Sequence, residues 1–373
     1  MIRLERRLDQ PWWLSIAVPL GSLAVAFAIL AVVLAVSGHA VGETFRDIVE
    51  AGFTGNQSLS TTLISATPIL FTGLAAAAAF RMELFNIGAE GQLYLGAVGA
   101  SWIALQLGDR GVDSTPLFVI SMCIAAAVLG AAWALIPGVL RAFANTNEII
   151  TSLMLNYVAG LLLTYLIYDS ASYWRDTSTL QARAFPQGKP MPEAAQWPSF
   201  GSDVVVPLGF AIGVGVAVVL WALYSRTRFG FEVSVIADSP RAARYAGMRT
   251  RRKILAVMAL SGAVAGIGGA SQVAEFSHTL DGSPQGLQAA AFGYTGIVVA
   301  ALARYNPLAV CLVAVLIGGL LNAGFTLQGA DFPSGLVGVM QGIILFCTLG
   351  GELLIRYRVR FGRRATAAAE AAP

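Results

Sequence analysis

Apolar stretches about twenty residues long recur along almost the whole of this 373-residue chain. A helix needs a stretch of that length to cross the roughly 30 Å hydrocarbon core of a bilayer. The composition agrees, because 56% of the residues are hydrophobic and only 12% are charged, against about 25% charged in soluble domains. The sequence therefore predicts an all-α, polytopic membrane protein.

Ten membrane-spanning helices are predicted from the apolar windows. They cover residues 13–37, 58–80, 87–107, 117–140, 147–168, 204–224, 254–273, 288–303, 307–324 and 335–356. The first is interpreted as a retained span, because its apolar run is longer than the 7–15 residues of a secretory signal core. We divide the chain into residues 1–57 (tail, first span and outer loop), a transmembrane domain at 58–356 and a disordered tail at 357–373.

The basic residues predict the orientation of these spans. If the N-terminus is cytoplasmic, most of the 24 lysines and arginines fall on the inner side, and the exceptions are Arg46, Arg110, Arg175, Arg183 and Lys189. Such a bias is typical of cytoplasmic loops. We therefore expect an even number of spans with both termini cytoplasmic, and the net charge of +3 reflects topology rather than a nucleic-acid partner.

The metal-binding residue types do not cluster. Cys123, Cys311 and Cys347 each lie in an apolar run, which favours small buried side chains over a disulfide or a metal site. His39 and His278 are far apart and without cysteines nearby. We expect neither a metal nor a cofactor in this chain.

A polar stretch interrupts the apolar sequence at residues 81–97, which read RMELFNIGAEGQLYLGA. A charged group at the bilayer centre costs about 2.5–3.5 kcal/mol on insertion scales, so polar groups there face protein or a water-filled path. Glycines weaken a regular helix, and broken helices commonly build solute sites near the midplane. The polar and glycine positions are Arg81, Glu83, Asn86, Gly88, Glu90, Gly91, Gln92 and Gly96. The alternative is that the glycines only let helices approach closely and that Arg81 and Glu83 form a cytoplasmic turn.

Two further polar segments enter predicted spans. In residues 145–157, Asn145 or Thr146 can cap a helix with Glu148 in its first turn, but Asn156 lies two turns further in and is expected to face the bundle interior. In residues 272–296, a short helix bracketed by glycines occupies the place in the second half that 87–107 occupies in the first, a pattern typical of inverted repeats. The polar residues of this segment are Glu275, His278, Asp281, Gln285 and Gln288, and Asn322 and Gln341 are further interior candidates or simple interhelical hydrogen-bonding residues.

The chain has no visible means of using ATP itself. Its two lysines, Lys189 and Lys253, do not complete a P-loop. The inner loop at 225–253 instead predicts a short helix, beginning near Asp238-Ser239-Pro240 and ending at Gly247. Such a helix suits a groove on another protein, and the alternative is a basic helix lying on anionic lipid.

Four ordered segments carry a family resemblance: FNIGAEGQLYLGA, TNEIITSLMLNY, ADSPRAARYAGM and FGYTGIVVAALARYNPLA. Together they resemble the permease subunits of bacterial ABC importers, in the nucleoside and simple-sugar branch of the group shared with ribose and branched-chain amino-acid permeases. The resemblance covers most of residues 58–350. It does not extend to the first 57 residues or to the tail.

The resemblance implies partners and a place in the cell membrane. This chain would be one of two related permeases forming a heterodimeric pore, joined to cytoplasmic ATP-binding subunits that hold ATP and Mg, and supplied by an extracytoplasmic substrate-binding protein. Residues 238–247 match the family's coupling helix, which seats in a cleft of the ATPase; the matching positions are Asp238, Pro240, Arg241, Ala243, Arg244, Tyr245 and Gly247.

The resemblance also implies a solute path. The positions matching the family's pathway motif are Phe85, Asn86, Gly88, Glu90, Gly91 and Gln92. Phe292 and Tyr294 can stack on a base or a sugar face. We therefore expect inward transport of a nucleoside or a related small polar solute by alternating access, without covalent chemistry. The alternative is a proton-coupled secondary transporter in which Glu90 or Glu275 carries the proton, which would leave residues 238–247 without a role.

Overall fold

The structure is a computed structural model whose described part is mostly helical. It describes residues 2–6, 14–36, 38, 40–169, 171–282, 287, 291–327, 338–340, 342–344, 346–347, 350–351 and 357–361. His39, Gln285, Gln288, Gln341 and most of the predicted span 335–356 lie outside these residues. The chain divides into two compact units, one of residues 1–45 with 328–373 and one of residues 46–327.

The α-helices are α1 (Leu14–Val36), α2 (Val41–Val49), α3 (Ser58–Phe80), α4 (Ala89–Asp109), α5 (Thr115–Ala144), α6 (Glu148–Tyr168), α7 (Leu180–Ala184), α8 (Leu208–Arg226), α9 (Arg228–Asp238), α10 (Pro240–Tyr245), α11 (Thr250–Ser271), α12 (Phe292–Leu302) and α13 (Pro307–Thr326). Two π-helices, η1 (Glu50–Thr54) and η3 (Gln272–Ser277), and one 3-10 helix, η2 (Glu193–Ala195), accompany them. Strands β2 (Ser199–Phe200) and β3 (Val206–Pro207) form a short antiparallel hairpin ahead of α8.

Among the described residues, six helices are long and apolar enough to cross a membrane. They are 58–80, 115–144, 148–168, 208–226, 250–277 and 307–326. The helix α4 is not among them, because Glu90, Gln92 and Gln106 lower its hydropathy. The chain is thus a multi-pass membrane protein, and the predicted spans agree with the observed helices to within a few residues wherever both are described.

Three departures from the predicted elements have local causes. The span expected from residue 204 begins at Leu208, because Val206 and Pro207 pair with β2 and Pro207 precedes the helix. The inner loop contains a further helix, α9, ahead of α10. Residues 357–361, assigned to a disordered tail, form strand β4, which pairs antiparallel with β1 (Ile2–Arg6).

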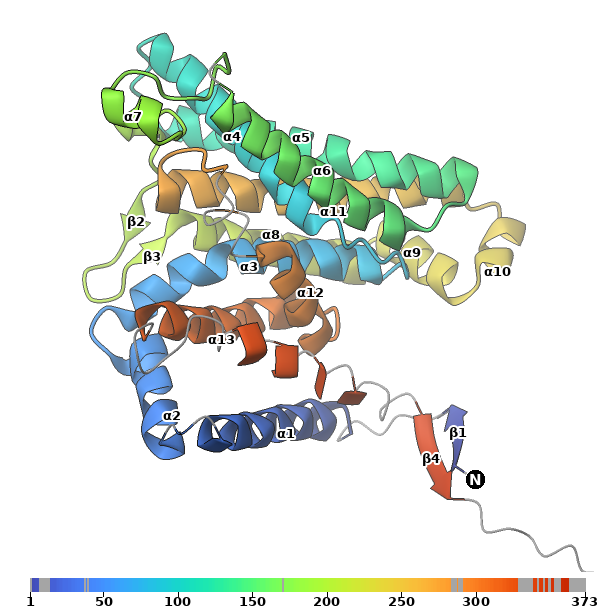
Figure 1. The fold of residues 1–373 in the computed structure, drawn as a ribbon. Helices are drawn as coiled ribbons and strands as arrows, with labels where there is room; N and C mark the ends of the chain where they lie inside the picture. The colour runs from blue at the N-terminus through green and yellow to red at the C-terminus, as the bar shows by residue number, and fades with distance from the viewer. Residues whose placement is uncertain are drawn as a thin grey trace, which may run out of the picture. The chain divides into compact units, whose positions relative to one another are not determined.

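Within residues 46–327, α4, α5 and α11 form one tightly packed group, with α6 against α4 (Figure 1). Glycines bring their backbones into contact: a Cβ added at Gly96 would lie 2.2 Å from the carbonyl oxygen of Gly266, and one at Gly130 would lie 2.3 Å from that of Gly262. Small residues allow this approach where lipid supplies no hydrophobic drive for association. The close-packing interpretation therefore holds for Gly96.

A second group of helices packs around α3. Helix α3 packs against α12 and α13, and it also contacts α11 of the first group. A Cβ at Gly296 would lie 2.4 Å from the Thr72 hydroxyl, and one at Gly318 would lie 2.6 Å from the Ala66 Cβ. Helix α3 is buried from Ala66 to Phe80. It forms the centre of the fold, as an apolar helix enclosed on all sides does.

Candidate functional site

The break between α3 and α4 is built around the side chain of Asn86, which is fully buried. The Asn86 Nδ2 donates to Gln92 Oε1 at 3.0 Å, and Gln92 Nε2 donates back to Asn86 Oδ1 at 3.0 Å. Asn86 Nδ2 also donates to the Ser261 hydroxyl at 2.9 Å, and that hydroxyl donates to the Ala75 carbonyl at 2.7 Å. The loop is thereby tied to α4, α11 and α3 at one point.

Helix α6 satisfies the free backbone groups at the start of α4. Asn156 Oδ1 accepts from the Gly91 amide at 2.9 Å, and Asn156 Nδ2 donates to the Ile87 carbonyl at 2.8 Å. Ser152 Oγ accepts from the Ile87 amide at 3.2 Å. The first amides of a helix have no partner within it, so these side chains replace the missing turn.

Glu90 connects the beginning of α4 to the beginning of α12. Its carboxyl is 2% exposed and accepts from the Tyr94 hydroxyl at 2.5 Å. The other carboxyl oxygen accepts from the backbone amide of Gly293. A Cβ at Gly293 would lie 2.3 Å from the Glu90 backbone nitrogen, so glycine is required for this approach. A carboxylate is favourable at a helix N-terminus, where amide groups point outward.

The structure brings five of the six pathway-motif residues together and leaves one apart. Asn86, Gly88, Glu90, Gly91 and Gln92 are buried, and their polar groups bond to one another and to neighbouring helices. Phe85 is 41% exposed and packs on Phe80 with ring centroids 5.3 Å apart. The buried network therefore holds the broken helix in shape.

The candidate site residues in the second half of the chain also lie in different places. Tyr294 is 36% exposed, and its hydroxyl accepts from Asn156 Nδ2 at 3.3 Å, which joins it to the network. Asn322 donates to the Thr61 hydroxyl at 2.9 Å and to the Ala51 carbonyl at 3.1 Å, which fastens η1 and α3 to α13. Phe292 is buried and lines a cavity.

That cavity has a volume of about 440 Å³ and lies between α3, η3 and α13. Its described lining residues are Thr61, Ile64, Ser65, Gln272, Val273, Phe276, Ser277, Asp281, Leu287, Phe292, Leu321, Asn322 and Phe325. We call it the α3–η3–α13 chamber. Asp281, Phe292 and Asn322 could be selected from the sequence, whereas Ser65 and Phe276 could not, because a single serine or phenylalanine in an apolar run carries no signal of its own.

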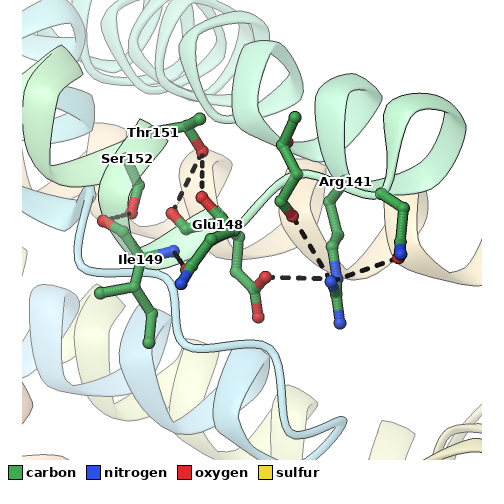
Figure 2. A network of polar contacts seen from close by, with 8 residues as sticks. Arg141, Glu148, Ile149, Thr151 and Ser152 are labelled. Carbon is green, nitrogen blue, oxygen red and sulfur yellow. Dashed lines mark hydrogen bonds and ion pairs between the residues drawn. The ribbon is translucent and has the colours of Figure 1, made fainter.

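The turn between α5 and α6 contains an ion pair. Figure 2 shows the Arg141 side chain extending to Glu148, with Nε 3.2 Å from Oε2. Asn147, not Asn145 or Thr146, caps α6, because its side chain accepts from the Ile149 amide at 2.9 Å. Asn145 instead ends α5 with φ of 52°, a left-handed conformation that asparagine tolerates.

The predicted inner helix is present as α10, and Ser239 is its cap. The Ser239 hydroxyl accepts from the Ala242 amide at 3.3 Å, while Asp238 is the last residue of α9. Gly247 follows with φ of 74°, as expected after a helix. Ala243 is fully buried, whereas Tyr245 is 94% exposed. The side chains of Pro240, Arg241 and Arg244 are exposed as well.

An ion-pair cluster holds α9 against the start of α11. Glu232 lies 2.7 Å from Lys253 Nζ and 2.9 Å from Arg228 Nε. The hydrogen bond from Lys253 holds the pKa of the Glu232 carboxyl below its usual range, with a smaller contribution from Arg228. Glu232 therefore remains a carboxylate at neutral pH, and its contacts orient the segment that carries α10.

Comparisons with known proteins agree with these features. Residues 58–349 match the family described as branched-chain amino acid transport system / permease component. The chain is 32% identical to a glucose ABC transporter permease of Haloferax volcanii, covering 97% of this chain and 95% of that protein. It is 30% identical to a guanosine ABC transporter permease of Bacillus subtilis (92% and 94% covered) and 27% identical to a nucleoside ABC transporter permease of Lactococcus lactis (89% and 90%). The chain therefore belongs to this permease family and is the permease subunit of an ABC importer.

Proposed function

We propose that the chain carries a nucleoside, or a related small polar solute, inward across the membrane by alternating access. Relatives named for guanosine and for nucleosides support this substrate class, and a relative named for glucose keeps a sugar as the second candidate. The chain performs no covalent chemistry in this scheme. ATP and Mg belong to separate ATPase subunits.

The proposed topology has ten spans with both termini cytoplasmic. The distribution of lysine and arginine supports it. Within residues 46–327, α7 of the outer segment 169–203 and α10 of the inner segment 225–253 lie at opposite ends of the long helices (Figure 1), as this topology requires. Loops on opposite faces of a bilayer must be separated in this way.

An inverted repeat is proposed for the two halves of the domain. The packing of α11 on α4 and α5 parallels that of α3 on α12 and α13, and both sets rely on glycine contacts. Helices α4 and α12 both begin after non-helical residues, and their N-termini meet at Glu90 and Gly293. Paired interrupted helices at a repeat interface are common in transporters.

The observation that carries the energy-coupling proposal is α10. It is short, capped and anchored by buried Ala243, yet Arg241, Arg244 and Tyr245 are exposed. A helix this short has little stability of its own. A contact with another protein would therefore stabilise it. We assign that contact to a cytoplasmic ATPase, with a second permease and an extracytoplasmic binding protein completing the importer.

No described contact favours the proton-coupled alternative. Both carboxyl oxygens of Glu90 are engaged by Tyr94 and Gly293. Glu275 Oε1 accepts from the Gly209 amide at 2.5 Å, near the start of α8. Both acids thus perform structural work at helix N-termini, where a carboxylate is favourable.

Reconstitution into vesicles tests the proposal. The permease is assembled with its partner permease, ATPase and binding protein, and accumulation of labelled guanosine is followed with and without ATP. We expect accumulation that requires ATP and every subunit. Concentration of the solute by this chain alone, driven by a pH gradient, would contradict it.

A further inference from the structure

Two polar side chains in the lining of the α3–η3–α13 chamber, Gln272 and Ser65, are available to bind a ligand. Gln272 is 9% exposed, and its carboxamide has no hydrogen-bond partner among the described residues. The Ser65 hydroxyl likewise has none among them. A carboxamide that lines a cavity without a protein partner can both donate to and accept from a ligand.

The amide side chains at the start of α4 are already engaged with protein groups. Asn86 and Gln92 bond to each other, and Asn156 bonds to Gly91, Ile87 and Tyr294. A solute binding there would have to break these contacts before making its own. The chamber can accept a solute without that loss.

The size and lining of the chamber indicate what it can hold. Its volume of about 440 Å³ falls within the range of about 300–1,000 Å³ typical of ligand pockets. Phe276 is 64% exposed and Phe325 is 61% exposed, and with Phe292 they supply three aromatic rings to the wall. The faces of a nucleobase can stack on such rings.

This lining discriminates between the two candidate solute classes. A free sugar carries hydroxyl groups around its whole perimeter, and each would lose its water against a largely apolar wall. A nucleobase has two apolar faces and a polar edge, and a glutamine carboxamide can donate and accept along such an edge at once. Aromatic rings with one free carboxamide therefore match a base better than a sugar.

The π-helix η3 explains how Gln272 and Phe276 come to share one wall. Both lie on η3, which continues α11 from Gln272 to Ser277. A π-helical turn widens the backbone and is frequent at functional sites. His278 then ends the element with φ of 53°, which directs the chain away.

We propose that the α3–η3–α13 chamber holds the solute during passage and receives its base, with the rings of Phe276, Phe292 and Phe325 against the base faces and the Gln272 carboxamide and Ser65 hydroxyl on its edge. The inference rests on the proposed import of nucleosides, and it adds the place and the mode of recognition.

Protection from thiol labelling tests the place. In the assembled importer, with Cys123, Cys311 and Cys347 replaced by alanine, Ser65→Cys is labelled with a small methanethiosulfonate reagent. At a guanosine concentration about ten times Kd, we expect labelling to slow about tenfold, because only the empty fraction reacts. Ser114→Cys, an exposed position before α5, is the control and should label at the same rate throughout.

The possible results distinguish failure of the chamber assignment from failure of the proposed nucleoside import. Guanosine uptake with unchanged labelling of Ser65→Cys overturns the chamber assignment. Equal protection by glucose and guanosine overturns base recognition. Absence of nucleoside uptake by the unmodified importer instead overturns the proposed function.

A kinetic variant tests the mode of recognition. Gln272→Ala removes one hydrogen-bonding group worth about 0.5–1.5 kcal/mol, so KM for guanosine should rise about 2- to 10-fold with kcat and assembly retained. Gln106→Ala, on α4 outside the chamber, should leave KM unchanged. An unaltered KM in Gln272→Ala would remove Gln272 from the site.

Discussion

The carboxyl group of Glu90 accepts a hydrogen bond from the backbone amide of Gly293, 203 residues further along the chain. Glu90 lies in the first turn of α4 and Gly293 in the first turn of α12. The two interrupted helices are thus joined at their N-termini by one side chain. A change in the tilt of either helix is transmitted to the other through this contact.

Substitution of Glu90 should have graded effects. Glu90→Ala leaves the buried Gly293 amide without an acceptor, at a cost of about 1–3 kcal/mol, and should abolish uptake and lower the melting temperature. Glu90→Gln keeps one acceptor, and the Tyr94 hydroxyl can turn to accept from the new amide, so stability should be largely retained. Thermal unfolding in detergent measures this, with Glu83→Gln, an exposed acid on the same loop, as the control. Equal melting temperatures for Glu90→Ala and the unmodified protein would contradict the structural role.

The glycine contact between α4 and α11 should not tolerate a methyl group. In Gly96→Ala the new Cβ would lie 2.2 Å from the Gly266 carbonyl oxygen, and overpacking of this kind costs about 1–3 kcal/mol. Gly215→Ala on α8 has no atom within 4 Å of its Cβ and should be neutral or stabilising by up to about 1 kcal/mol. Equal melting temperatures for Gly96→Ala and Gly215→Ala would show that the close contact at Gly96 does not restrict the size of the side chain there.

Charge reversal on α10 should weaken capture of the ATPase. For Arg241→Glu with Arg244→Glu, we expect affinity to fall about tenfold, or about 1.4 kcal/mol, while membrane insertion is unaffected because both side chains are exposed. Co-purification of the tagged permease with its ATPase is the measurement. Arg110→Glu with Arg183→Glu also reverses two charges, one directly after α4 and one within α7, and should not alter capture. Unchanged recovery in the α10 variant would separate α10 from coupling.

Cysteine accessibility should report the orientation of the chain. Leu180 is 85% exposed on α7 and Tyr245 is 94% exposed on α10. We expect an impermeant thiol reagent to label Leu180→Cys from outside the cell and Tyr245→Cys only after the membrane is opened. Arg175 is less suitable for a cysteine substitution, because its side chain donates to the carbonyls of Tyr168 and Arg183 and the substitution would remove both hydrogen bonds. The reverse pattern would invert the topology.

Hydropathy predicted the helices well, because a membrane-spanning helix is one continuous apolar segment of the sequence. The bounds of α3 agree with the predicted 58–80, and those of α6 and α13 agree to within two residues. The contacts within the site could not be predicted in this way. Asn86 bonds to Ser261, which lies 175 residues away in the sequence. A local sequence pattern cannot distinguish a polar residue that bonds within the protein from one that is free to bind a solute.

The same limit explains why the solute site that we propose is the chamber and not the polar motif. Glu90 and Gln92 stand out in an apolar sequence, yet their hydrogen bonds are made within the protein. Gln272 is a single glutamine after a glycine-rich helix, and only the folded chain reveals that its carboxamide faces a cavity. The π-helical geometry of η3 likewise depends on packing and has no sequence signature.

The glycine seam between α5 and α11 also bears on how tightly the membrane stays sealed. At Gly130 and Gly262 the two backbones approach so closely that an added methyl group would overlap a carbonyl oxygen. A space too small for a methyl group is also too small for a water molecule. At these two glycines the interface has no room for a water molecule, so this contact itself offers no path to protons or sodium ions.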